Sequence, residues 1–165
     1  MSYQEKKTIT SIVSGFILMG AYVMHALGRY RAGTAPADDL ALWAGMMLRY
    51  IGIGIIVTII LQIVFHILLS VGIAVREKMR DETCEDKVIE TTIKQEMVED
   101  ERDKLIELKS LRVGFILAGI GFIAALLCLV LGYPPVLMLH ILFFSFFTGS
   151  IFEGFSQLYF YRRGF

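Results

Sequence analysis

Two pairs of long hydrophobic segments, separated by one charged stretch, organise this chain of 165 residues. The hydrophobic segments start near Thr8, Leu40, Leu111 and Val136. Each is about 20 residues long or longer, which is the length that an α-helix needs to cross a bilayer. The stretch between the two pairs, 76–110, is rich in charged residues. This pattern predicts an all-α polytopic membrane protein, with four transmembrane helices and a charged helical insert between the second and the third.

The composition agrees with this prediction. Hydrophobic residues make up 56% of the chain and the mean hydropathy is +0.64, whereas a soluble domain has about 45–50% apolar residues. No segment is large enough to build a separate soluble core, so we expect 1–165 to be a single membrane domain. Cys84 lies in the charged stretch and Cys128 in a hydrophobic segment, so a disulfide is not expected.

The second hydrophobic segment is longer than a bilayer requires. As a helix, 40–75 would measure about 54 Å, against about 30 Å for the hydrocarbon core. Either this helix tilts and projects, or its start lies on the membrane surface, and Arg49 favours a second span at about 50–75. The other expected spans are about 8–26, 111–131 and 136–160.

Short polar stretches mark where the helices are expected to begin and end. Asp38 or Asp39 precedes the second segment, and a carboxylate there can accept hydrogen bonds from free backbone N–H groups. Asp100 is placed to cap a helix that continues into the third span. The sequence Gly-Tyr-Pro-Pro at 132–135 predicts a tight turn between the third and fourth spans, because proline cannot continue a helix.

The charged stretch contains an apolar line. Ile89, Ile93 and Met97 are spaced four apart, as on one side of a short amphipathic helix. Such a line must pack on the rest of the insert, on another subunit or on a soluble partner. We therefore expect a non-enzymatic protein that binds or regulates a cytoplasmic protein partner through 76–110. Within 76–112 there are twelve acidic and nine basic residues, so nucleic acid is not an expected partner.

The basic residues predict the orientation. The positive-inside rule places the side with more Lys and Arg in the cytoplasm. The side of the termini carries the nine basic residues of 76–112 and also Lys6, Lys7, Arg162 and Arg163; the opposite side carries Arg29, Arg31 and Arg49. The sequence therefore predicts a multi-pass protein of the prokaryotic cytoplasmic (inner) membrane, with both termini in the cytoplasm.

Small residues form a seam along the third span. They recur at spacings of four and three, which places them on one side of a helix, and such seams let helix backbones approach closely in lipid. The residues are Gly114, Ala118, Gly121 and Ala125, followed by Cys128 and Gly132. The seam predicts packing against another helix of the same chain or, as a second arrangement, a homodimer.

The fourth span carries an acidic residue near the middle of the bilayer. Glu153 precedes Arg162 by nine residues, or about 13 Å along a helix. His66 precedes Arg76 by ten residues, which gives it a similar depth, and Gln62 is one turn further along the same side. Ser145, Gly149, Glu153 and Gln157 recur every four residues. We predict a binding site formed by Glu153, His66, Gln62 and Gln157.

A charge at this depth costs about 2.5–3.5 kcal/mol on insertion scales. Glu153 can avoid that cost by pairing with a protonated His66, or by staying protonated, because loss of hydration disfavours the charged form of a carboxyl group. One interpretation is a relay. The protein would then be a small proton- or cation-coupled transporter or channel, either as a monomer or as a dimer. The other is an interhelical hydrogen bond that fixes the packing.

Catalytic and metal-binding patterns are not found in the sequence. There is no nucleophile elbow, no His-Glu-x-x-His motif and no phosphate-binding glycine loop. His25, His66 and His140 fall at unlike depths, which does not suit three or four convergent metal ligands. We expect no catalytic residue, no metal and no cofactor.

The segment DERDKLIELK at 100–109, followed by a glycine-containing span and a closing YRRG, resembles small uncharacterised prokaryotic four-span membrane proteins. These carry a DERD-x-x-I-x-x-Lys/Arg signature ahead of a membrane helix. The matching positions are Asp100, Glu101, Arg102, Asp103, Ile106 and Lys109. Members are often encoded beside small helix-turn-helix regulators, so the resemblance implies a regulatory or stress-response role. It implies no catalytic residue.

Overall fold

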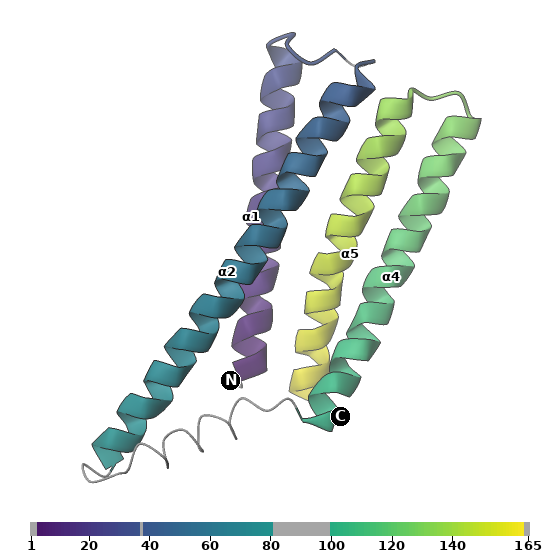
Figure 1. The fold of residues 1–165 in the computed structure, drawn as a ribbon. Helices are drawn as coiled ribbons and strands as arrows, with labels where there is room; N and C mark the ends of the chain where they lie inside the picture. Colours follow the sequence, from purple (N-terminus) through teal and green to yellow (C-terminus); the bar gives the residue numbers. More distant parts are fainter. Residues whose placement is uncertain (1–2, 37, 81–99, 164–165) are drawn as a thin grey trace.

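The computed structural model describes residues 3–36, 38–80 and 100–163, and these form four long helices (Figure 1). Each helix is long and apolar enough to cross a membrane, which confirms the all-helical, four-helix prediction. The helices are α1 (Tyr3–Arg31), α2 (Leu40–Arg80), α4 (Glu101–Val130) and α5 (Pro135–Arg163). The predicted apolar line of the insert, Ile89, Ile93 and Met97, lies outside the described residues.

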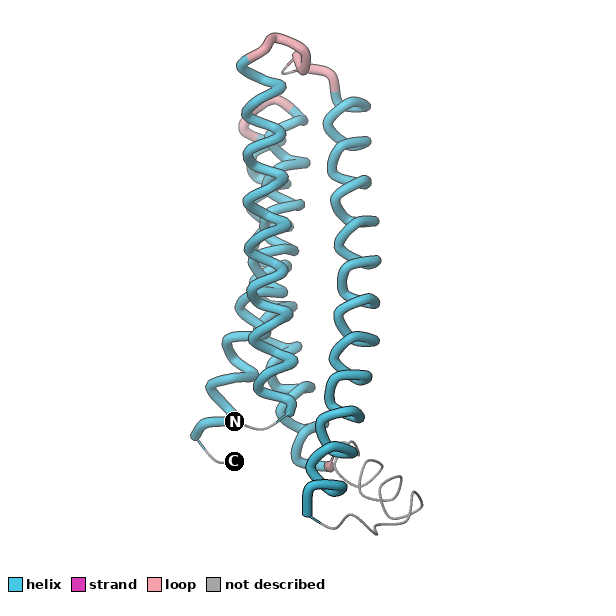
Figure 2. The backbone as a smooth tube through the Cα atoms, turned by 90° about the vertical axis from the view of Figure 1, so that its left-hand side faces the viewer, coloured by secondary structure: helices cyan, strands magenta, loops and turns pink. Residues whose placement is uncertain are grey.

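The helices form two hairpins that stand side by side (Figures 1 and 2). Both described ends of the chain, Tyr3 and Arg163, lie at one end of the bundle with the start of α4, and we call this the terminal end. The segments 32–36, 38–39 and 131–134 lie at the other end, which we call the turn end. Helix α5 is the central element: it packs most extensively against α4, then against α1, and least against α2.

The outer surface of the bundle is apolar. Phe115 and Val130 of α4 are 78% and 83% exposed, and the most hydrophobic stretch of α2 has no buried residue. Exposed apolar side chains of this kind are stable in lipid, where the backbone groups must be satisfied within each helix. The sequence therefore places its hydrophobic residues where a bilayer would surround them.

Local signals in the sequence set the ends of the helices. Asp100 caps α4: its side chain accepts from the N–H of Glu101 at 2.7 Å, and Asp103 completes a capping box. Asp39 caps α2 by accepting from the N–H of Leu42 at 3.0 Å. Helix α4 is closed by Gly132, whose φ of +80° lies in the left-handed region that glycine adopts freely. The predicted caps and the predicted turn at 132–135 are confirmed.

The small seam of α4 packs against α5 in the same chain. A β-carbon on Gly149 of α5 would lie 2.7 Å from the carbonyl oxygen of Gly114, and one on Gly114 would lie 3.0 Å from the carbonyl oxygen of Gly149. Gly121 lies against the side chain of Ser145 in the same way. Only residues without side chains allow the two backbones to come so close. Within one chain, α5 already covers this seam.

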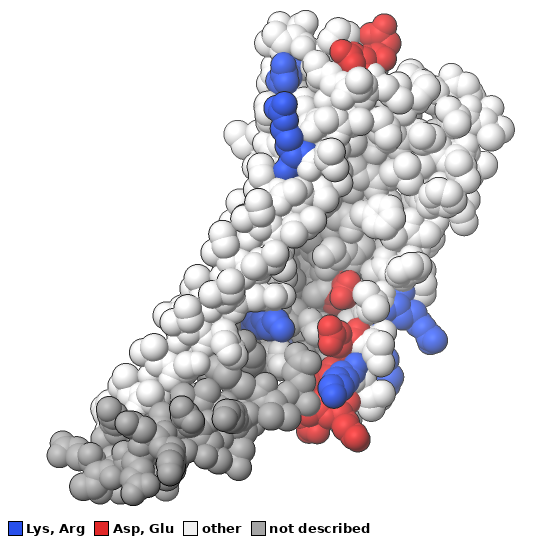
Figure 3. Space-filling model, in the orientation of Figure 1, with Lys and Arg blue, Asp and Glu red and all other residues white. Residues whose placement is uncertain are grey.

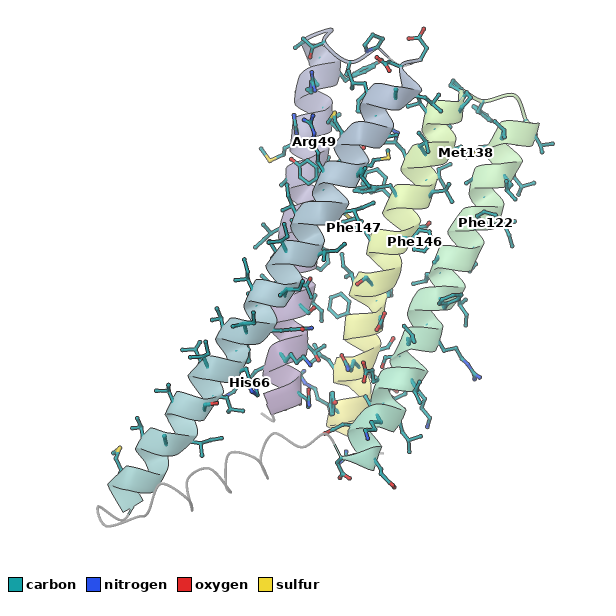
Figure 4. All side chains as sticks on the ribbon, viewed as in Figure 1. Arg49, His66, Phe122, Met138, Phe146 and Phe147 are labelled. Atoms are coloured by element: carbon teal, nitrogen blue, oxygen red, sulfur yellow. The ribbon has the colours of Figure 1, made fainter. Side chains whose placement is uncertain are left out.

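Helix α2 is a single helix of 41 residues, about 61 Å long. Its start belongs to the bundle, because Trp43 and Met46 are buried. The helix continues without interruption past the exposed Arg49, which Figure 4 labels near the turn end. Further along, α2 leans away from α5, whereas α1 stays beside α5 at the terminal end (Figure 1).

Candidate functional site

The divergence of α2 leaves a cavity of about 640 Å³ between α1, α2 and α5. Its lining runs from Thr8 and Gln157, near the terminal end, to Leu18 and Phe147, halfway along the bundle. Hydroxyl and amide side chains come from all three helices. Glu153 of α5 is the only charged residue among its described lining residues.

A second cavity, of about 210 Å³, continues from the first toward the terminal end. The two share Glu153 and the four polar residues Thr8, Ser11, Gln62 and Gln157. The second cavity also reaches three charged residues of α1 and α4, namely Lys7, Asp103 and Glu107. Figure 3 shows acidic side chains gathered at this end of the bundle, beside the hollow between α2 and the α4–α5 pair. Glu153 therefore lies where a polar entrance meets a deeper chamber.

Glycines make room for Glu153 between the helices. A β-carbon on Gly114 of α4 would lie 3.1 Å from Oε2 of Glu153, so the carboxyl group rests on the bare backbone of α4. On the α1 side, a β-carbon on Gly154 would lie 2.6 Å from Cγ1 of Ile12, so Gly154 brings α1 close. Glu153 is half-buried, and its carboxyl group has no hydrogen bond or ion pair with any residue that the structure describes.

Helices α1 and α5 are joined beside Glu153 by a polar contact. The Oγ1 hydroxyl of Thr8 lies 2.9 Å from Oε1 of Gln157 and 2.8 Å from the backbone oxygen of Gln4. Thr8 is 5% exposed, so this hydroxyl is almost fully removed from solvent. Since a hydroxyl has a single hydrogen to donate, it is shared between the two acceptors. The contact holds Gln157, the residue one turn after Glu153, against the wall of the cavity.

The structure brings together three of the four site residues predicted from the sequence. Glu153, Gln62 and Gln157 line both cavities. His66 is exposed and is not among the described lining residues of either cavity. Figure 4 labels it on the part of α2 that has separated from the bundle. Equal depth along two helices places residues together only if the helices stay in contact, and α2 diverges beyond Gln62.

Apart from Gln62, the polar lining of α1 and α2 was not predicted from the sequence. Thr8, Ser11 and Gly15 follow the spacing of one side of a helix, and so do Thr58 and Gln62 four residues apart. Small and hydroxyl residues at helical spacing in a hydrophobic segment were the available signal. The charged entrance had no such signal, because Asp103 and Glu107 lie at the start of α4, far from Glu153 in the sequence.

Toward the turn end, the cavity is closed by a layer of buried side chains. Tyr22, Met47 and Phe143 each lie one turn beyond a lining residue, and all three are buried. Tyr22 is completely buried, and its hydroxyl lies 3.1 Å from Nε2 of His140. The other ring nitrogen of His140, Nδ1, lies 2.8 Å from the backbone oxygen of Val136 and donates to it, which leaves Nε2 to accept from Tyr22.

The polar groups of this site are hydroxyl and amide groups around one carboxyl group. A carboxylate with neighbouring hydroxyl and amide groups suits a proton or a cation, because it supplies negative charge and hydrogen-bond acceptors together. Within 3–36, 38–80 and 100–163, no three His, Cys, Asp or Glu residues converge as metal ligands.

Comparisons of the chain with protein families, with curated proteins and with solved structures gave no match.

Proposed function

We propose that this protein is a small, non-enzymatic integral membrane protein that binds and moves protons or cations at Glu153. The proposal rests on one observation: Glu153 lies within a helix long enough to span a membrane and still lines a polar cavity that reaches the charged terminal end. A residue that served only to fix helix packing would need a polar partner and no access. Glu153 has access, and it has no hydrogen-bond partner among the described residues.

The charges at the entrance support a cationic ligand. Two acidic residues, Asp103 and Glu107, and one basic residue, Lys7, line it together with Glu153. A cleft with an excess of one charge attracts ions of the opposite sign and raises their local concentration. In this proposal a cation enters from the terminal end, binds at Glu153, and leaves toward the turn end when the layer of Tyr22 and Phe143 opens.

The orientation and the membrane are part of the proposal. The excess of Lys and Arg on the side of the termini favours a cytoplasmic entrance, and the membrane that we propose is the prokaryotic inner membrane. The cavity then faces the cytoplasm in the conformation that the structure describes. A carboxylate can hold a proton or a cation but not both at once, which would couple the two.

The sequence also predicts that 76–110 binds a cytoplasmic protein partner. This stays a prediction, because 81–99, with its apolar line, lies outside the described residues. Removing 83–97 from the full chain and measuring which cytoplasmic proteins remain bound would test it. Undiminished binding would contradict it.

Flux measurements test the proposed function directly. The purified chain is reconstituted in liposomes, and the fluxes of H⁺, Na⁺ and K⁺ are followed under an imposed gradient. We expect the native protein to carry at least one of these ions, and Glu153→Gln to lower that flux about tenfold or more, since it removes the only charge among the described lining residues of the chamber. Asp38→Asn is the matched control, because it neutralises an exposed acid at the turn end.

Two results would contradict the proposal. One is the absence of any flux from correctly folded native protein. The other is a flux that Glu153→Gln leaves equal to that of the native protein. In either case the carboxyl group would be a structural element of the bundle.

A further inference from the structure

The larger cavity has two chemically different ends. Around Glu153 its walls are polar, with Thr8, Gln62 and Gln157. Toward the middle of the bundle its walls are apolar and aromatic, with Leu18, Ile51, Ile55, Phe146 and Phe147. A proton or a metal ion would use only the polar end. The apolar end, which continues the same chamber, is then without a role.

We infer that the ligand of this cavity is an organic cation with an apolar body. Its positive charge would lie at Glu153 and its apolar body between Leu18 of α1 and Phe146 and Phe147 of α5. This inference rests on the proposed function and names the class of cation. Figure 4 labels Phe146 and Phe147 on the stretch of α5 that faces α2, on the turn-end side of Glu153.

The size of the chamber fits this class of ligand. A volume of about 640 Å³ lies within the roughly 300–1,000 Å³ that is usual for small-molecule sites, which are mostly apolar with a few placed polar groups. The entrance of about 210 Å³ is polar and acidic, so it favours the charged part of such a molecule.

The charge of the chamber excludes the other classes of organic ligand. Its described lining contains no Lys, Arg or His, so an anion would meet the carboxyl group without a counter-ion. A neutral apolar molecule would displace water from Glu153 without supplying a hydrogen bond or a charge to replace it. Only a cation both fills the apolar end and pairs with the acid. The ring of Phe147 is held by Phe143, with centroids 4.7 Å apart, so one aromatic wall is fixed before binding.

Binding of two ions with one shape tests the inference. Tetraphenylphosphonium is a permanent apolar cation, and tetraphenylborate has the same shape with a negative charge. Both are titrated by equilibrium dialysis against the full chain in lipid nanodiscs, with empty nanodiscs as the background. We expect saturable binding of the cation alone, weakened about tenfold or more by Glu153→Gln, because a charged partner is lost.

A second pair of variants tests the apolar end. Gly54 lines the chamber, and a β-carbon there would lie at an ordinary 3.6 Å from Leu18, so Gly54→Leu fills the space. Gly52 has nothing within 4 Å, so Gly52→Leu is the matched control. We expect the first variant to weaken tetraphenylphosphonium binding about tenfold and the second to leave it unchanged, because only the first takes up ligand volume. If Gly54→Leu does not fold, Ile55→Phe, which faces the chamber, and Ile56→Phe, which does not, replace the pair.

The outcomes separate this inference from the proposed function. Glu153-dependent flux of H⁺, Na⁺ or K⁺ without saturable tetraphenylphosphonium binding would overturn the inference and leave the function standing. Phosphonium binding that neither Glu153→Gln nor Gly54→Leu weakens would also overturn it, since the ion would then lie elsewhere or in the bilayer. If flux and binding are both independent of Glu153, the inference and the proposed function fail together.

Discussion

Helix α5 packs tightly on one side and borders a cavity on the other. Against α4 it presents Gly149 and Ser145, which lie directly on Gly114 and Gly121. Against α1 and α2 it presents Phe147 and Gln157, which line a chamber of about 640 Å³. The first interface depends on the absence of side chains. On the second side α1 stays in contact with α5, and the divergence of α2 leaves the chamber between them.

The difference shows that α4 and α2 have different roles beside α5. The pair of α4 and α5 forms a rigid unit, because backbones in direct contact have no room to shift without a clash. Helix α1 also packs against α5, whereas α2 has the fewest contacts with α5, so α2 is the loosely packed wall of the chamber. The proposed functional carboxyl group lies at the junction: Glu153 rests on Gly114 of the tight interface and lines the chamber.

The largest effect is expected from a side chain in the tight interface. Gly149→Leu would bring its β-carbon within 2.7 Å of the carbonyl oxygen of Gly114, so α4 and α5 must separate. We expect a loss of about 1–3 kcal/mol or more in the free energy of unfolding, as for overpacked cores. Denaturant titration in detergent, followed by circular dichroism, measures it. Gly119→Leu, which adds the same side chain where nothing lies within 4 Å, should be neutral, and equal effects would contradict the comparison.

Water access gives the next largest difference. Ser11 lines both parts of the cavity, whereas Ser110 of α4 is completely buried and its hydroxyl has no partner among the described residues. In a background without Cys84 and Cys128, Ser11→Cys should react with a water-soluble thiol reagent on the order of a hundredfold faster than Ser110→Cys, since protected groups react only after local opening. Mass spectrometry over time measures both rates. Similar rates would mean that the chamber is not open to water.

Filling the chamber should cost little stability. Gly54→Leu adds as many atoms as Gly149→Leu, but into the chamber, where its β-carbon would make an ordinary contact of 3.6 Å with Leu18. We expect a change within about 0.5 kcal/mol, as for substitutions away from packed sites. The same denaturant titration measures it. A loss as large as that of Gly149→Leu would show that α2 packs on α1 and α5 as tightly as α4 does.

The smallest effect is expected at the polar contact between α1 and α5. Thr8→Val keeps the shape and removes the hydroxyl that lies 2.9 Å from Gln157. Interhelical hydrogen bonds in membrane proteins contribute about 0.6 kcal/mol on average, so a loss of that size is expected. Thr10→Val is the control, because its hydroxyl donates only to Lys6 of its own helix. If the double variant Thr8→Val/Gln157→Leu loses more stability than Thr8→Val alone, the two residues do not act only through this hydrogen bond.

Much of the fold follows from local patterns. The four hydrophobic segments, the caps at Asp39 and Asp100 and the turn at 132–135 each depend on neighbouring residues, so the sequence was enough to predict them. The seam at Gly114 and Gly121 likewise predicted a close helix contact, although it left the partner open.

The candidate site depended on tertiary structure. The row Ser145, Gly149, Glu153, Gln157 was predicted to form one polar face of the fourth span. A helix has 3.6 residues per turn, so a row spaced by four turns about 40° around the axis at each step. The row therefore begins in the interface with α4 and ends against Thr8 of α1. Gln62 of α2 lines the same cavity as Gln157. His66, one turn further along the diverging α2, is not among its described lining residues.

The sequence by itself determined that the protein has four helices of membrane length, where their caps lie, and that one of them carries an acid in an apolar segment. These properties depend on hydrophobicity and on backbone groups that are satisfied within a few residues. Only the tertiary structure decided that α5 is central, that α2 leans away and that Glu153 borders a chamber with a polar and an apolar end. Those properties depend on the angles between helices, which are set by contacts among residues far apart in the chain.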